Sequence, residues 1–253
     1  MKRQRCDDYT GPFTDGIDVS HWQGQIDWGQ VASEAPSVRF AIVRVGDGKD
    51  VDRRFAENYR EVQRVGIRRG TYQYFRADRG GVFQADLLLR EMEAAGGFAD
   101  GDLPPCIDWE GGSDKNLRGG LLDGDDDIPI EVVAEEALRW LDRIEQALGC
   151  VPLLYTGQAF HWLISQARPD LAPAFARYPL WIAGGRTKAL MPVDKRGRGF
   201  PWETWTIHQH SARGSVPGIE GNVDLDRFRG DGDAFAAWPA PAVLDVCCCP
   251  CHD

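Results

Sequence analysis

Short apolar runs alternate with helical patterns along most of the chain. Runs rich in β-branched and aromatic residues, such as 39–45 and 71–75, predict buried strands. Between such runs, apolar residues recur every three or four positions, as in segment 55–65, which stops before Gly66. The predicted strands cover 16–20, 39–45, 71–75, 105–110, 152–156, 179–183, 204–209 and 223–226. The predicted helices lie near 28–35, 55–65, 83–92, 132–148 and 160–165, and a short apolar segment follows at 234–238.

This alternation favours a parallel sheet, because parallel strands need crossover connections that are usually helical. Seven or eight strands in about 230 residues fit a closed barrel better than an open sheet. We therefore predict an α/β fold: an irregular single-domain (β/α) barrel, TIM-barrel-like, with a helix-poor C-terminal part. The barrel should span 15–238, with a disordered or loosely attached N-terminus at 1–14 and a Cys-rich tail at 239–253.

The charge balance narrows the possible partners. The chain has 29 Lys and Arg against 39 Asp and Glu, a net charge of −10, which argues against nucleic-acid binding. No apolar run reaches the length of about 18 residues that a membrane span needs, so we expect no membrane insertion. The first 13 residues lack the apolar centre of a classical signal peptide. We expect a monomer.

The seven cysteines do not form a recognisable framework. Four of them crowd into the last seven residues, within the segment 247–251, and the other three are scattered. Adjacent cysteines do not supply the spaced pairs of a structural zinc site. We therefore expect no metal and no cofactor, and interpret the segment as a redox-sensitive tail of unknown use.

Polar side chains at the ends of predicted strands are the candidates for chemistry, because functional residues of parallel α/β folds gather at carboxyl ends of strands. Four strand ends carry residues that a core would not accommodate. They are Asp18 with His21, Asp108 with Glu110, Gln209, and Asp224.

The triplet Asp108-Trp109-Glu110 is the most informative of these. Alternation along a strand places Asp108 and Glu110 on one face and Trp109 on the other. Two carboxyl groups side by side supply a proton donor and an anion that stabilises positive charge, the two roles that glycoside hydrolysis requires. The alternative is a pair of solvated acids at a strand end.

The segment Asp18-Val19-Ser20-His21-Trp22-Gln23-Gly24, read with Ile26-Asp27-Trp28, resembles the opening motif of the glycoside hydrolase family 25 lysozymes. These N-acetylmuramidases cleave peptidoglycan between N-acetylmuramic acid and N-acetylglucosamine. Further similar segments follow in the family's order, so the resemblance covers about residues 15 to 230. They lie at 40–48, 70–75, 103–110, 154–157, 180–183, 205–211 and 216–226.

The resemblance implies that Glu110 is the general acid/base and Asp108 its partner, in a reaction that retains anomeric configuration. Asp108 then either attacks carbon or orients the substrate's own N-acetyl group as nucleophile. Asp18 and Asp224 match two further acidic groove residues with electrostatic roles. For Asp224 the alternative is that the neighbouring Asp226 holds this place.

The resemblance also implies a set of substrate-binding residues, with core packing as the competing interpretation for the aromatic ones. They are Tyr72, Tyr74, Tyr155, Trp181 and Gln209. Trp22 either packs under the first loop or touches sugar. Residues that depart from those frequent in the family are Gln73, His208, His210 and the end of the second strand at Arg44-Val45-Gly46-Asp47-Gly48.

Two rival functions use the same residues. In one, Asp18, Asp108, Glu110 and Asp224 with His21 hold a divalent metal and form a metal-dependent hydrolase. In the other, the barrel binds peptidoglycan glycan strands without cleaving them. For the lysozyme, we expect synthesis in the cytoplasm and action on the cell wall. Release through a membrane pore, as for a phage endolysin, and export by a dedicated secretion system are both consistent with the sequence.

Overall fold

The computed structural model describes residues 4–6, 8–110, 128–157, 160, 164–165, 167–184, 189–192 and 199–238. The predicted tail at 239–253 lies outside these residues. None of the described helices is both long and apolar enough to cross a membrane.

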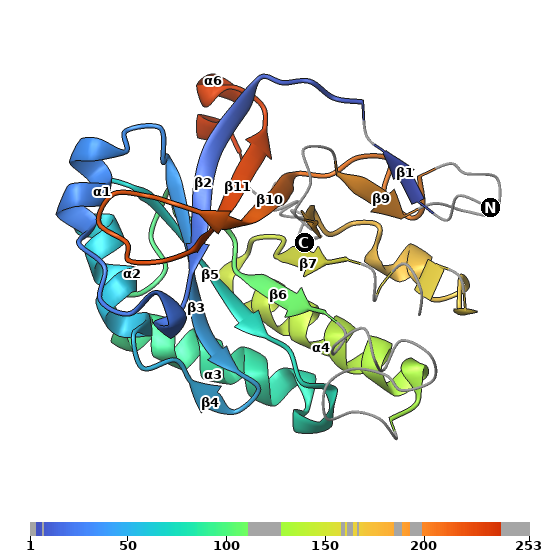
Figure 1. Cartoon of the computed structure of the whole chain (residues 1–253). Coiled ribbons are helices and arrows are strands. Elements are labelled where there is room, and N and C mark those ends of the chain that lie inside the picture. The colour runs from blue at the N-terminus through green and yellow to red at the C-terminus, as the bar shows by residue number, and fades with distance from the viewer. Residues whose placement is uncertain are drawn as a thin grey trace, which may run out of the picture.

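Eight strands close into a ring, which confirms the predicted barrel (Figure 1). The ring closes because β2 pairs with β3 as well as with β11. Seven strands run parallel, and β11 is antiparallel to both of its neighbours. The strands are β2 (Phe13–Val19), β3 (Phe40–Asp47), β5 (Arg68–Tyr74), β6 (Cys106–Trp109), β7 (Leu153–Thr156), β8 (Leu180–Ala183), β10 (Ile207–Gly214) and β11 (Val223–Arg229).

Helices cover the strands of the first half of the barrel (Figure 1). They are α1 (Trp28–Glu34), α2 (Phe55–Arg64), α3 (Gly81–Ala94) and α4 (Ile130–Leu148). Beyond β8, the described residues add only the short α6 (Gly232–Ala236), as the helix-poor prediction required. The described residues also form the 3-10 turns η1 (His21–Gln23), η2 (Ala77–Arg79) and η4 (Ala172–Phe175).

The alternation of side chains along each strand divides the apolar residues into two cores. Phe40 and Ile42 of β3, with Cys106 of β6, point into the barrel and fill its lower part. Their neighbours Ala41 and Val43 point outward and pack under the helices. The interior core therefore fills the lower part of the barrel. Open space is left only near the rim, where polar side chains replace apolar ones.

Residues expected to precede the barrel make ordered contacts. Phe13 and Thr14 belong to β2, and Gln4–Cys6 form β1, which pairs with β9 (Leu190–Pro192). The Arg229 guanidinium lies 3.9 Å from the ring centroid of Tyr9. Asp50–Val51 form β4, a short antiparallel extension of β3.

Candidate active site

A pocket of about 190 Å³ opens where the parallel strands end. All the residues that line it are predicted site residues. They are Asp18, Tyr72, Asp108, Glu110, Tyr155, Trp181, Gln209 and Asp224. The remaining predicted residue, Tyr74, is not among them: it is half-buried, and the guanidinium of Arg76 lies 4.5 Å from its ring centroid.

Strand β6 places the two central carboxylates as alternation predicted. Asp108 lies opposite Tyr74 of β5 and Tyr155 of β7, inside the barrel, and Glu110 follows one residue after the strand ends. Trp109 points the other way and packs against the ring of Phe160, with centroids 5.7 Å apart. The close packing of Trp109 fixes the strand, and with it the direction of Asp108.

Asp108 is only 4% exposed, and this burial raises the pKa of its carboxyl well above the ordinary value. The charge of Glu110 raises the pKa further, and the positive charges of Arg44 and Arg76 oppose the shift. Among the described residues, no hydrogen-bond donor reaches Asp108 Oδ1. This buried oxygen therefore has an unused capacity to accept a hydrogen bond.

Asp18 belongs to a chain of hydrogen bonds that crosses the pocket. Gln209 Nε2 donates to Asp18 Oδ2 over 2.8 Å, and Tyr155 Oη donates to Gln209 Oε1 over the same distance. Burial raises the pKa of Asp18 well above its ordinary value, and the charges of Asp226 and Asp224 add to the effect. The orientation of Gln209 is thus fixed by partners on both sides.

From the sequence, Asp226 was expected only as an alternative to Asp224 for the same groove position. The structure places the two residues at different depths in the barrel. In the pairing of β11 with β2, Asp224 lies opposite Asp18 at the pocket, and Asp226 lies opposite Gly16, one step deeper. Asp226 is fully buried and accepts a 2.8 Å hydrogen bond from Trp181 Nε1. Burial raises its pKa to about 7, although hydrogen bonds with Asp18 and Trp181 act in the opposite direction.

Arg44 is a second residue that the sequence did not single out as part of the site. It lies on β3, and its Nε donates to Asp52 Oδ2 over 2.9 Å. His21 Nδ1 lies 2.9 Å from the same Asp52 oxygen, so the imidazole is directed at Asp52. Across the described residues, no three His, Cys, Asp or Glu side chains are placed to hold a metal ion together.

Two of the departures from the family pattern point away from the pocket. Gln73 accepts a 3.0 Å hydrogen bond from Trp140 Nε1 of α4 and donates to the Gly48 carbonyl. His208 is fully buried, and its Nε2 lies 3.1 Å from the Gly184 carbonyl oxygen. Because both side chains face outward from the barrel, their identities bear on packing rather than on a bound molecule.

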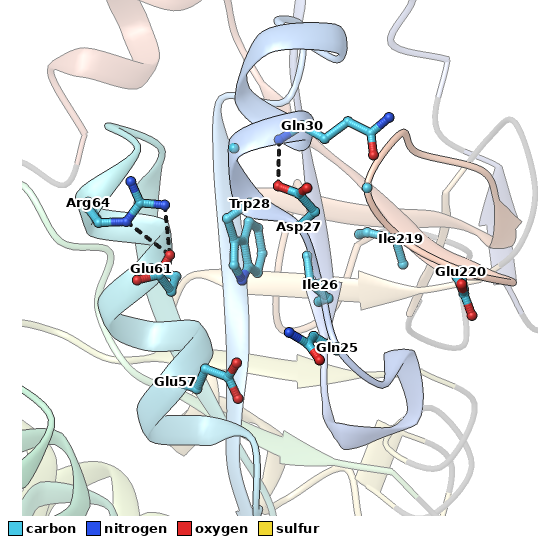
Figure 2. A pocket seen from close by; sticks show the side chains of 12 residues that line it. Gln25, Ile26, Asp27, Trp28, Gln30, Glu57, Glu61, Arg64, Ile219 and Glu220 are labelled. Atoms are coloured by element: carbon cyan, nitrogen blue, oxygen red, sulfur yellow. Dashed lines mark hydrogen bonds and ion pairs between the residues drawn. The ribbon is translucent and has the colours of Figure 1, made fainter.

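A larger pocket, of about 680 Å³, lies between α1, α2 and the turn at Gly218–Glu220 (Figure 2). Two of its carboxylates have structural partners: Asp27 accepts from the backbone N–H of Gln30, and Glu61 pairs with Arg64. The hydrogen bond from Arg64 lowers the pKa of Glu61, which is unfavourable for a proton donor. The smaller pocket in the barrel mouth is therefore the candidate active site.

Comparison with known proteins agrees with this geometry. The family model for glycosyl hydrolases family 25 matches residues 17–219. Lysozyme M1 of Streptomyces globisporus is 31% identical over 231 residues, which cover 88% of this chain and 70% of the lysozyme. An uncharacterised protein of Escherichia coli K12, YegX, is 32% identical over 227 residues, covering 88% of this chain and 72% of YegX.

Solved structures give the same result for the fold. The bacterial lysozyme of Streptomyces coelicolor superposes with a TM-score of 0.70 at 27% identity, covering 90% of this chain and 97% of the lysozyme. A family 25 glycosyl hydrolase from Bacillus anthracis gives a TM-score of 0.69 at 26% identity, covering 92% and 96% of the two chains. The fold and the pocket thus define a glycoside hydrolase. The chain belongs to glycosyl hydrolases family 25, as its sequence motifs implied.

Proposed function

We propose that the protein is a lysozyme that hydrolyses the β-1,4 bond between N-acetylmuramic acid and N-acetylglucosamine in bacterial peptidoglycan. The observation that carries this proposal is the gathering of Asp108, Glu110, Asp18 and Asp224 with Tyr155 around one pocket. The similar chains called lysozymes support the choice of substrate.

In this proposal Glu110 is the general acid/base. It lies at the open end of β6, beyond the buried Asp108, where a glycosidic oxygen can approach it. Protonation by Glu110 allows the sugar to leave, and the same group later removes a proton from water. Asp18 and Asp224 supply electrostatic support, and Tyr72, Tyr155 and Gln209 supply hydrogen bonds to the glycan.

We further propose that the substrate's N-acetyl group is the nucleophile and that the reaction retains anomeric configuration. Burial raises the pKa of the Asp108 carboxyl, which lowers the share of the nucleophilic carboxylate form at any given pH and so disfavours direct attack by Asp108. The unpaired Oδ1 of Asp108 suits an acetamido N–H, which becomes a stronger donor as the acetamide attacks carbon.

The release of reducing ends from purified peptidoglycan tests this function. Glu110→Gln should lower the rate at least about a hundredfold, because general acid catalysis contributes about 10² to 10⁴. Glu61→Gln, in the other pocket, is the matched control and should retain the rate. NMR identifies the anomer that is released first, and we expect it to have the same configuration as the cleaved bond.

Three results would contradict the proposal. Undiminished release by Glu110→Gln would remove the assignment of the acid. Loss of activity in EDTA would favour a metal-dependent hydrolase, and binding without release by the unaltered chain would favour a glycan-binding barrel.

A further inference from the structure

Trp22 differs from most other tryptophans in its exposure to solvent. Its relative exposure is 77%, whereas six other tryptophans are no more than 5% exposed. These are Trp28, Trp109, Trp140, Trp181, Trp202 and Trp205. An indole ring is a large apolar surface, and leaving it in water forgoes the stabilisation that burial would give. Packing therefore gives no reason for an indole at this position.

The backbone that carries Trp22 is held in place from several directions. Ser20 Oγ accepts from the Trp22 backbone N–H over 3.2 Å, and Gln23 Oε1 accepts from the Ser20 N–H over 2.9 Å. These two bonds form a capping box on η1. Gln23 Nε2 also donates to the Asn222 carbonyl, which ties the turn to the segment that leads into β11.

The ring next to Trp22 is also fixed. The His21 and Trp22 ring centroids lie 4.5 Å apart at an interplanar angle of 33°. Asp52 Oδ2 accepts from the His21 backbone N–H over 3.0 Å and lies 2.9 Å from His21 Nδ1. The imidazole thus supports one side of the indole, and the rest of the indole remains open to solvent.

A pocket of about 270 Å³ lies beside this indole. Trp22 and the half-exposed Val51 supply apolar surface to it, and Asp50 and Arg53 supply hydrogen-bonding groups. Arg44 also lines this pocket, and in the pairing of β3 with β5 it lies opposite Tyr72, which lines the candidate active site. The two pockets are therefore neighbours at the same end of the barrel.

We propose that Trp22 and this pocket bind a sugar of the glycan strand that lies outside the two residues joined by the cleaved bond. The inference rests on the proposed lysozyme function. A pyranose ring has an apolar face of C–H groups that can cover the exposed indole, and its hydroxyl groups can donate to Asp50 and accept from Arg53. Because the turn is already ordered, little conformational entropy is lost when the sugar binds.

The test is calorimetric binding of un-cross-linked strands of alternating N-acetylglucosamine and N-acetylmuramic acid, in a Glu110→Gln background that prevents cleavage. The short strand is a single disaccharide, which has only the two sugars that the cleaved bond joins, and the long strand has four disaccharide units. We expect the longer strand to bind more tightly, and Trp22→Ala to weaken its binding about tenfold, with a smaller effect on the shorter strand. Trp22→Phe should restore most of the affinity.

Phe83→Ala is the matched control, since Phe83 is another exposed aromatic residue, on α3. It should bind both strands as the parent does, and the thermal midpoints of all variants should agree. Equal affinities of the parent and Trp22→Ala for both strands would overturn the inference, as would an equal loss for both lengths. Reducing-end release by the chain with Glu110 intact decides the lysozyme function separately.

Discussion

Asp18 of β2 and Asp226 of the paired strand β11 are buried carboxyl groups inside the barrel, and the charge of Asp226 raises the pKa of Asp18. Two buried carboxylates would repel each other, so the pair favours a state in which they share one proton. Asp226 Oδ1 accepts from Trp181 Nε1, and no N–H or O–H group of the described residues donates to Asp226 Oδ2. The arrangement couples the protonation of a pocket residue to that of a buried one.

The first prediction concerns the pH dependence of stability. The pKa of Asp226 is raised to about 7, so its stabilising contribution is complete below the ordinary carboxyl value near 4. That contribution is lost as the pH rises through about 7, at up to about 1.4 kcal/mol per pH unit. Asp226→Asn keeps the acceptor for Trp181 and supplies a permanent donor to Asp18, so this loss should be reduced.

Unfolding in urea at a series of pH values measures the effect. The unfolding free energy of the unaltered chain should fall more steeply between about pH 4 and pH 8 than that of Asp226→Asn. Asp226→Leu is the comparison, because it leaves Trp181 Nε1 without an acceptor and should cost about 1–3 kcal/mol. Parallel curves for the unaltered chain and Asp226→Asn would show that no shared proton is present.

The second prediction concerns Arg44 and Asp108. The Arg44 charge opposes the upward shift of the Asp108 pKa, so Arg44→Leu should raise that pKa further. Arg44→Lys retains the charge and is the control. Titration of the Asp108 carboxyl by ¹³C NMR measures its pKa in both variants. Identical pKa values in Arg44→Leu and Arg44→Lys would show that the charge at position 44 does not affect Asp108.

The third prediction concerns the hydrogen bond between Tyr155 and Gln209. Without the Tyr155 hydroxyl, Gln209 Oε1 loses its donor and Gln209 is less firmly directed at Asp18. Tyr155→Phe should lower kcat/KM for peptidoglycan about three- to tenfold, the equivalent of one neutral hydrogen bond. The thermal midpoint should change little, since the ring still packs 4.7 Å from Trp181. Unchanged kinetics would show that this hydrogen bond does not contribute.

The fourth prediction separates packing from binding at Gln73. Gln73→Leu leaves Trp140 Nε1 without its acceptor and should destabilise the fold by about 1–3 kcal/mol, measured by urea unfolding. KM for peptidoglycan should stay within about twofold, because the side chain faces away from the pocket. Gln25→Leu, at an exposed position, is the control for stability. A large rise in KM for Gln73→Leu would mean that the outer layer affects binding.

Much of the site could be predicted from the sequence because the alternation of side chains is a local property. The period of two places Asp108 and Glu110 on one face of a strand without knowledge of its neighbours. The same rule assigns Gln73 and His208 to the faces opposite Tyr72 and Gln209. Closure into a barrel was predicted from the density of strands and helices, but the antiparallel direction of β11 was not.

The alternation of side chains along a strand does not predict how deep in the barrel a given residue lies. Asp224 and Asp226 share a face of β11, and only the pairing with β2 decides which of them reaches the pocket. Gly16 lies opposite Asp226, and a Cβ atom there would come within 2.4 Å of the Phe40 ring. Position 16 therefore requires glycine, because the ring of Phe40 on the neighbouring strand β3 occupies the space that a side chain would need.

Arg44 shows that the effect of a charge on a residue of another strand also cannot be predicted from the local sequence pattern. Nothing in its sequence neighbourhood relates it to Asp108, because the two residues lie on strands separated by β5. The sequence by itself determined the barrel class, the pair of acids on β6 and the family. Tertiary structure decided that Asp226 supports Asp18 from below, that Arg44 opposes the burial of Asp108, and that Trp22 stays in solvent. The physical reason is that register and ring closure set distances between strands, and electrostatic and hydrogen-bond energies depend on those distances.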